Sequence, residues 1–529
     1  MRLALRTRAA ADGGCELEQQ GDWGGSQDSS GDLGEVTAHG ADGRALELQV
    51  LGHGRWSVRA APGEELRVEW SVAPNEILLS PTHQDHYRAA LTGELFHAIG
   101  NHLWIAPVAA REQPSLRIAL DWKGFDALGW RTVCSFGDAA HLVVERPLGE
   151  FRQAVFLAGR YRLLERPIRG CRLCVALPDE GLRVDPEGFA DLAARVVEGQ
   201  RAFFEDWDYP FYLVSAVATG REGAPSSSLG GTGLTDSFAL FLQRGSDLRP
   251  GAPLYENVLH VLAHEMFHNW CGRWTPIAEP EQLCYWFSEG FTEFFTRRLL
   301  LRSGLATRAE YAQSLERSLQ DYRRNPRRNC SNEEIRAGFW KERETGEMPY
   351  RRGDLVAARL DQAIRAKSRG RQSLDDFLRE AVALGRRGEK LDVETLLARI
   401  ERWTDADLAA QLRRVVVEGA TLELPRDTFA PCLAIENALV PRYELGFDFE
   451  QSRAAGTITG LVPGSAAAKA GLLEGQKLAG FSGERRADRP VRVDVLVDGQ
   501  RRSIEYLPQG AGEELPCVRL GEERACDVL

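Results

Sequence analysis

The stretch His264–His268, which reads HEMFH, constrains this chain of 529 residues more than any other feature. On an α-helix, residues four apart lie on one face, one turn from each other. His264 and His268 would then direct both imidazoles at one metal ion. Glu265 would stand beside that face, where it can take a proton from a metal-bound water. This is the HExxH spacing of zinc-binding helices, and a helix with two unrelated histidines is the alternative.

The residues around the motif favour a helix. Residues 255–263 contain neither proline nor glycine, and their apolar residues recur with helical spacing. Gly272 and Pro276 supply a stop signal after the motif. His260 lies one turn before His264. We expect it to be a packed histidine or a partner of a ligand, because three successive turns rarely converge on one ion.

A catalytic zinc needs a third protein ligand and an open position for water. The sequence has no histidine after His268, so a downstream ligand must be Asp, Glu or Cys. The aromatic-rich segment YWFSEGFTEFF carries Glu289 and Glu293 one turn apart, and buried carboxylates are costly unless paired or metal-bound. Glu289 is the candidate ligand. Glu293 either orients a ligand histidine or lies on a solvated helix face. The rival ligands are Cys271 and Cys284.

The stretches HEMFHNW and WFSEGFTEFF resemble the gluzincin metallopeptidases, and most closely the glycyl aminopeptidase family. In that family the glutamate of the second stretch completes the zinc site, which implies Glu289 here. Residues 348–361 resemble the family segment whose tyrosine hydrogen-bonds the tetrahedral intermediate, and Tyr350 matches that tyrosine. A phenol near zinc can stabilise developing oxyanion charge. The alternative for Tyr350 is a structural residue at a helix start after Pro349.

One segment departs from the family pattern. Family members carry a Gly-Gly-x-Glu-His type segment on the edge strand of the active site, and related aminopeptidases grip the free amino group of the substrate with its glutamate. Here Gly233 and Leu234 stand in those two positions. Asp236 and Glu222 are candidate substitutes, and zinc hydrolysis is better supported than aminopeptidase specificity. The substrate-binding candidates are the residues of the equivalent stretch, namely Gly230, Gly231, Thr232 and Gly233.

The C-terminal part has a second signature. Residues 443–449 resemble the carboxylate-binding loop and strand of PDZ domains, and residues 462–472 resemble the segment that leads into their first helix. Alternating apolar residues over 491–506 suit two strands joined through Asp498-Gly499. In the PDZ mode a C-terminal peptide would add as a strand while loop amides hold its carboxylate. Alternatively, the glycines only permit turns. The loop residues would be Leu445, Gly446 and Phe447.

Together these segments predict a multidomain α+β chain. The alternating runs 45–50 and 65–72 predict β-strands, and Ser373 is a plausible N-cap for a helix. The Gly-, Asp- and Ser-rich first forty or so residues are expected to be loosely ordered. The expected parts are a β-rich domain (1–165), a thermolysin-like gluzincin catalytic domain that is helical from about residue 291 (166–425), a PDZ-like domain (430–512) and a tail (513–529).

The net charge of −11 argues against a nucleic-acid or anionic-membrane partner. No segment reaches the roughly 18 apolar residues of a membrane helix. The N-terminal residues lack an apolar core of signal-peptide length. We therefore expect a cytoplasmic protein, or a periplasmic one if the start is misassigned.

The sequence thus predicts a zinc-dependent peptidase with one Zn²⁺ per chain, held by His264, His268 and Glu289. Glu265 would be the general base and Tyr350 the oxyanion donor. The resemblance implies an aminopeptidase acting on peptides with small N-terminal residues, Gly or Ala. The alternatives are an endopeptidase or oligopeptidase without a free N-terminus requirement, a PDZ-type peptide-binding protein with a vestigial zinc site, and a hydrolase of some non-peptide amide.

Overall fold

The computed structural model describes all residues except 27–28, 223–228 and 522–528. Within the described residues, no helix has both the length and the apolar character that a membrane span requires. The chain divides into two compact units: a larger one of Met1–Tyr311 and Asn329–Leu422, and a smaller one of Ala312–Arg328 and Glu423–Leu529.

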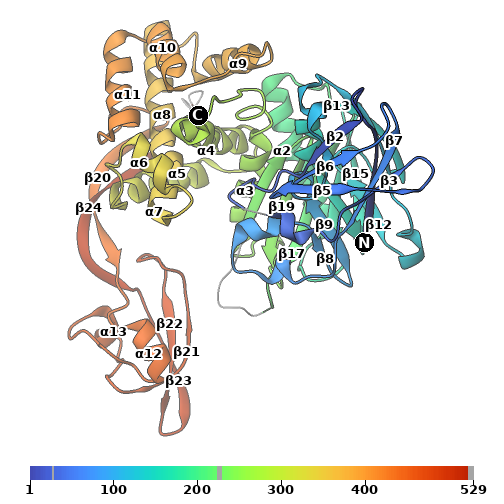
Figure 1. The fold of residues 1–529 in the computed structure, drawn as a ribbon. Helices are drawn as coiled ribbons and strands as arrows, with labels where there is room; N and C mark the ends of the chain where they lie inside the picture. The colour runs from blue at the N-terminus through green and yellow to red at the C-terminus, as the bar shows by residue number, and fades with distance from the viewer. Residues whose placement is uncertain (27–28, 223–228, 522–528) are drawn as a thin grey trace. The chain divides into compact units, whose positions relative to one another are not determined.

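The first part of the larger unit, blue in Figure 1, is built from β-sheets. Its strands are β1 (Arg2–Arg8), β2 (Gly14–Glu18), β3 (Thr37–Gly40), β4 (Ala45–Leu46), β5 (Leu48–Gly52), β6 (Arg55–Arg59), β7 (Glu65–Ser71), β8 (Ala90–Leu91), β9 (Leu95–Ile99), β10 (Ala106–Pro107), β11 (Leu116–Asp121), β12 (Arg131–Cys134), β13 (His141–Arg146) and β14 (Val155–Gly159). Three sheets have the orders β1-β7-β3-β4, β10-β2-β6-β5 and β12-β14-β9-β8, and β11 pairs with β13. The predicted strands at 45–50 and 65–72 are therefore present, the first in two pieces.

The described part of the first forty residues, which leaves out 27–28, is ordered, and here the structure corrects the prediction. β1 pairs along its whole length with β7, and β2 with β6. Leu3 and Leu17 are buried in the core of this part. The Gly-, Asp- and Ser-rich composition belongs to the connections between the strands, whereas the strands themselves alternate between buried and exposed residues.

A mixed five-stranded sheet follows, with the order β15-β16-β17-β19-β18. Its strands are β15 (Tyr161–Ile168), β16 (Cys171–Pro178), β17 (Phe211–Thr219), β18 (Leu229–Leu234) and β19 (Ser237–Gln243). The three central strands run parallel, and the two edge strands run antiparallel to their neighbours. Every residue of β17 is buried, as its nearly continuous apolar sequence requires for a strand covered on both faces.

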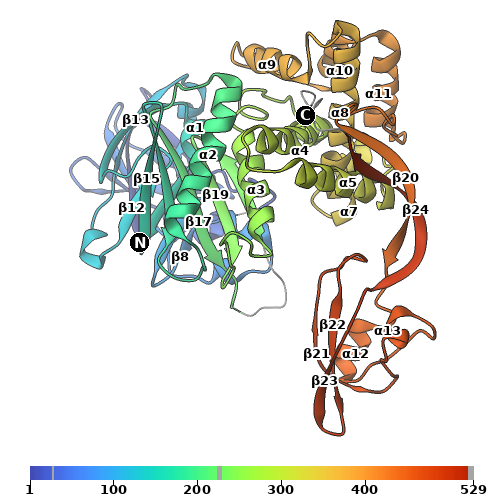
Figure 2. The same cartoon turned by 180° about the vertical axis from the view of Figure 1, so that it is seen from behind.

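Two helices cover one face of this sheet. They are α2 (Pro186–Phe204), which packs on β15 and β16, and α3 (Tyr255–Phe267), which packs on β18 and β19. Figure 2 shows both helices in front of the sheet. The opposite face packs on β9 and β14 of the N-terminal part through Ile99, Leu157 and Phe241. The sheet is therefore the middle layer of the larger unit, and α3 lies along its β18 edge.

The remainder of the larger unit is helical, as predicted. It contains α4 (Tyr285–Arg302), α6 (Asn332–Gly338), α7 (Arg343–Gly346), α8 (Met348–Ser368), α9 (Leu374–Gly385), α10 (Val393–Trp403) and α11 (Ala406–Glu418). The predicted N-cap is present at α9, where the Ser373 hydroxyl accepts from the backbone N–H of Asp375 and Asp376 completes a capping box. Leu374 and Phe377 are buried on one face of that helix.

Helices α4 and α8 cross at two glycines. A Cβ placed on Gly353 would overlap the backbone oxygen of Trp286, and a Cβ on Gly290 would overlap the backbone of Gly353. Only glycine lets the two backbones approach this closely. The crossing brings the first turn of α8, which carries Tyr350, beside the turn of α4 that carries Glu289.

Buried arginines fasten the same helices. Arg297 donates to Asp354 at 2.5 Å, and Arg298 donates to Asp361 at 2.7 Å and to Asp375 at 2.8 Å. Removing one partner of such a pair would leave a buried charge uncompensated. These pairs therefore fix α4 against both α8 and α9.

The smaller unit contains the end of α5 (Arg308–Arg324), a long antiparallel pair and a three-stranded sheet. Its remaining elements are β20 (Leu433–Tyr443), β21 (Lys477–Ser482), β22 (Val491–Val497), β23 (Gln500–Tyr506), β24 (Gln509–Leu520), α12 (Phe449–Ala455) and α13 (Ala466–Lys469). β20 pairs with β24, and the sheet has the order β21-β22-β23. The predicted hairpin between β22 and β23 is present, with positive φ at both Asp498 and Gly499.

The structure corrects two predictions in this unit. Residues 513–520, predicted as part of a tail, belong to β24 and find their partner in the distant β20. After the loop Leu445–Phe447 the chain forms α12 where a strand was expected. Asp448 caps this helix by accepting from the backbone N–H of Gln451 at 2.9 Å, a role that aspartate favours.

We expect Gly353→Ala to lower the free energy of unfolding by about 1–3 kcal/mol, because the added methyl meets backbone that cannot rotate away. Denaturant unfolding of the full chain measures the change. Gly149→Ala is the matched control, since Gly149 is also helical (α1, Leu148–Arg152) and a Cβ there meets nothing within 4 Å. If the two variants unfold at the same midpoint, the crossing does not depend on glycine.

Candidate metal centre

The helix that carries the HExxH motif is anchored by its apolar side. Val258, Leu262 and Met266 of α3 are buried against the sheet in the main core of the larger unit. The opposite side of α3 therefore presents His264, and the helical backbone continues through His268, which caps it with φ −62° and ψ −14°.

The two imidazoles of the motif and Glu289 meet at one point. Nε2 of His264 lies 3.2 Å from Nε2 of His268, and Oε2 of Glu289 lies 3.3 Å and 3.4 Å from these two atoms. A tetrahedral zinc with ligand bonds of about 2.0–2.1 Å has ligand–ligand edges of about 3.3–3.4 Å. The three atoms thus have the spacing of three corners of such a site.

Each imidazole has a close partner at its other nitrogen, through a hydrogen bond in His268 and through an ion-pair contact in His264. Nδ1 of His268 donates to the backbone oxygen of Cys271 at 2.9 Å, which leaves the lone pair on Nε2. Nδ1 of His264 lies 3.1 Å from Oε1 of Glu293. Carbonyl and carboxylate partners of this kind fix the ring orientation of metal-binding histidines.

The electrostatics of the site favour a cation. Burial lowers the pKa of His264, but the carboxylates of Glu289 and Glu293 outweigh burial and raise it well above its usual value. Burial raises the pKa of Glu289, but the imidazoles of His268 and His264 outweigh burial and hold it well below its usual range. Three carboxylates, counting Glu265, surround these imidazoles, and a divalent ion would balance them.

Glu265 is tethered by the edge strand of the sheet. Its Oε2 accepts from the backbone N–H of Gly233 at 2.8 Å. A Cβ on Gly233 would lie 2.6 Å from the backbone oxygen of Glu265, and Cβ atoms on Gly230 and Gly231 would overlap His83 and Phe238. Gly233 therefore allows close packing of the strand on α3, and Gly230 and Gly231 allow close packing on His83 and Phe238.

Thr232 occupies the same edge strand, between Gly231 and Gly233. The stretch predicted to bind substrate is therefore beside the candidate metal centre. At Gly233 the strand presents only a backbone N–H, which donates to Glu265. A side chain at this position does not fit without moving α3.

Tyr350 lies against the zinc helix as predicted. Its ring stacks on His264 with centroids 5.9 Å apart and planes 27° apart. Burial, followed by the charges of Glu289 and Glu265, raises the pKa of the Tyr350 phenol well above its usual value. The hydroxyl consequently stays protonated and able to donate a hydrogen bond.

The rival ligands do not join the site. Among the described residues, neither Cys271 nor Cys284 belongs to a group of side chains spaced to hold a metal ion. Both are buried, and burial raises the pKa of each thiol to about 12. A protonated thiol is a poor metal ligand, because the thiolate is the binding form.

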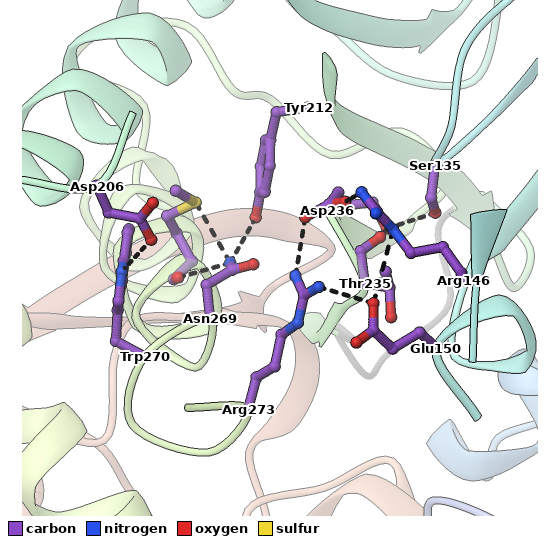
Figure 3. Close-up of polar contacts among 12 residues, drawn as sticks. Ser135, Arg146, Glu150, Asp206, Tyr212, Thr235, Asp236, Asn269, Trp270 and Arg273 are labelled. Carbon is purple, nitrogen blue, oxygen red and sulfur yellow. Dashed lines mark hydrogen bonds and ion pairs between the residues drawn. The ribbon is translucent and has the colours of Figure 1, made fainter. Parts of the chain in front are cut away.

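The two acids suggested as substitutes for the missing glutamate are committed elsewhere. Oδ1 of Asp236 accepts from Arg273 at 2.8 Å, and its Oδ2 lies 3.4 Å from Arg146. Arg273 also donates to Glu150 at 2.9 Å, so these residues form a closed network (Figure 3). Glu222 is exposed and lies 3.6 Å from the guanidinium of Arg183.

The network around Arg273 joins three segments far apart in the sequence. It links the turn that ends β18 with the loop after the zinc helix and with the end of β13. Asn269 donates to the Tyr212 hydroxyl at 2.9 Å, and Trp270 donates to Asp206 at 2.8 Å (Figure 3). These contacts hold the loop whose Cys271 carbonyl orients His268. These contacts have no signature in the sequence, because no local pattern connects residues so far apart.

The family comparison supports an aminopeptidase-like zinc enzyme. Residues 257–351 match the family model of the M61 glycyl aminopeptidases, which confirms the resemblance over the segment from the zinc helix to Tyr350. A search of curated proteins gives no match.

Solved structures support the fold. An aminopeptidase N family protein from Idiomarina loihiensis is similar with a TM-score of 0.73 and 17% identity, over 98% of this chain and 96% of that chain. An M1 zinc metallopeptidase from Deinococcus radiodurans has 17% identity over 80% of this chain and 90% of its own, but its TM-score of 0.47 carries no weight. The first similarity is evidence for the architecture alone.

We expect Asp236→Asn to destabilise the chain by about 1–3 kcal/mol, because it removes the charge that Arg273 faces. Asparagine keeps the shape and tolerates the positive φ of 47° at this position. The unfolding midpoint of the full chain measures the loss. Asp191→Asn is the control, because it breaks an exposed pair with Arg166 and should cost under about 1 kcal/mol. Equal losses in the two variants would contradict a special role for the network.

Proposed function

We propose that His264, His268 and Glu289 hold one Zn²⁺ and that the chain hydrolyses peptide bonds. The observation that carries this proposal is the triangle of 3.2–3.4 Å between the three ligand atoms. Zinc bound there supplies a Lewis acid and lowers the pKa of a water molecule. The M61 match over residues 257–351 supports the same activity.

The protein's own groups move the proton and stabilise charge. Glu265 takes a proton from the attacking water and delivers it to the leaving amine, and the N–H of Gly233 keeps its carboxylate beside the ligands. Tyr350 stays protonated and donates a hydrogen bond to the developing oxyanion. Glu293 holds His264 by its Nδ1.

The first candidate activity is an aminopeptidase that releases small N-terminal residues, Gly or Ala. The glycyl aminopeptidase family model supports this choice, because it covers the zinc ligands, Glu265 and Tyr350 together.

A second candidate is an endopeptidase or oligopeptidase that needs no free N-terminus. The packing of Gly233 favours it, because a glutamate cannot occupy that position without displacing the backbone of α3. Asp236 is neutralised by Arg273 and Arg146, so it offers no free charge for an ammonium group.

For the smaller unit we propose a PDZ-related module that does not bind peptides by strand addition beside Leu445–Phe447. α12 follows this loop directly, at the position where a PDZ strand would pair with a peptide.

Glu265→Gln tests the mechanism. We expect the variant to keep its zinc, measured by metal analysis of the purified protein, while kcat for peptide hydrolysis falls by about 10²–10⁴-fold because the proton acceptor is lost. Glu256→Gln is the matched control on an exposed position of the same helix and should leave kcat unchanged. Undiminished hydrolysis by Glu265→Gln would overturn the mechanism.

One peptide series with free and acetylated N-termini separates the two candidate activities. An aminopeptidase should release Gly or Ala from the free peptides and leave the acetylated ones intact. An endopeptidase should cleave both forms with similar kcat/KM, because no carboxylate recognises the ammonium group. Mass spectrometry of the products identifies the bond that is cleaved.

A further inference from the structure

His260 contacts the candidate metal centre through Glu293. Its side chain is 31% exposed, and its Nε2 lies 3.2 Å from Oε1 of Glu293. That same oxygen lies 3.1 Å from Nδ1 of His264. One carboxylate oxygen is therefore shared by two histidines one helical turn apart.

We propose that His260 is a positioning residue that holds Oε1 of Glu293 against His264 and thereby sets the affinity of the site for zinc. The inference rests on the proposed zinc site and goes beyond it, because it assigns the role to a residue that is not itself a ligand.

The need for such a residue follows from a competing cation. The Arg351 guanidinium lies 3.9 Å from Oε2 of Glu293, which is an ion-pair distance but too long for a hydrogen bond. Glu293 is buried, so its charge must be paired. A small rotation of the carboxylate would tighten its contact with Arg351 and loosen its contact with His264. His260 opposes that rotation because it binds the oxygen that faces His264.

The side chains of His260, His264 and Glu293 are also spaced to hold a second metal ion. An ion there, in addition to the proposed zinc, would require His264 to bind two metals, one through each ring nitrogen. A carboxylate that orients a zinc-binding histidine is the commoner arrangement. His260 extends that arrangement, because it contacts the carboxylate of Glu293.

Zinc affinity of the full chain, measured by competition with a chromogenic chelator, tests the inference. We expect His260→Ala to weaken zinc binding about 10–100-fold, the usual effect of losing a group that orients a ligand. His260→Gln should restore most of the affinity, because its amide can donate to Glu293. The control is His141→Ala, which removes an exposed partner of Asp121 and should not change the affinity.

A second variant separates positioning from a general loss of structure. Arg351→Met in the His260→Ala background removes the competing cation and should recover part of the zinc affinity. The unfolding midpoint of the zinc-free protein should change little in His260→Ala, since His260 is partly exposed.

Three outcomes would overturn the inference. Zinc affinity unchanged in His260→Ala would overturn it while leaving the proposed zinc site intact. Two zinc ions per wild-type chain, with one lost in His260→Ala, would show that the cluster is a metal site of its own. Failure of the wild-type chain to bind zinc would overturn the proposed function together with the inference.

Discussion

The close crossing of α4 and α8 at Gly290 and Gly353 is the constraint on which the candidate site depends. The zinc helix can supply two imidazoles by itself, because i and i+4 share a face. The third corner comes from Glu289 of α4, and the proposed oxyanion donor, Tyr350, comes from α8. These two helices reach the same point only because two glycine backbones touch where any side chain would separate them. The buried pairs Arg297–Asp354 and Arg298–Asp361 then hold the crossing in place.

This packing makes an electrostatically unfavourable cluster tolerable. Glu265, Glu289 and Glu293 converge on two imidazoles in a largely buried volume, and each carboxylate has a specific partner that limits its cost. Glu265 is paired with the backbone N–H of Gly233 in β18. Glu289 and Glu293 are paired with histidines of α3. The scaffold therefore holds the three candidate ligand atoms at the spacing that a tetrahedral metal ion requires.

The parts of this architecture that sequence reasoning predicts are those encoded locally. The HExxH spacing, Glu289 on the next helix, the Ser373 cap and the Asp498-Gly499 hairpin each depend on residues a few positions apart, and the structure contains all these local elements. The features that sequence reasoning does not predict depend on residues far apart in the chain. β1 is ordered because β7 pairs with it, β24 because β20 pairs with it, and the Arg273 network joins segments more than a hundred residues apart. Composition alone gave no signal for any of these pairings.

Gly233 in the edge strand β18 departs from the family pattern and also has a structural role. In the family pattern a glutamate is expected at this position. In the structure it is the position where β18 touches the backbone of Glu265, and its N–H holds the carboxylate of the general base. A side chain there would displace the backbone of Glu265, the proposed general base. The position therefore has no room for a glutamate that could grip an ammonium group, and its N–H is already bonded to Glu265.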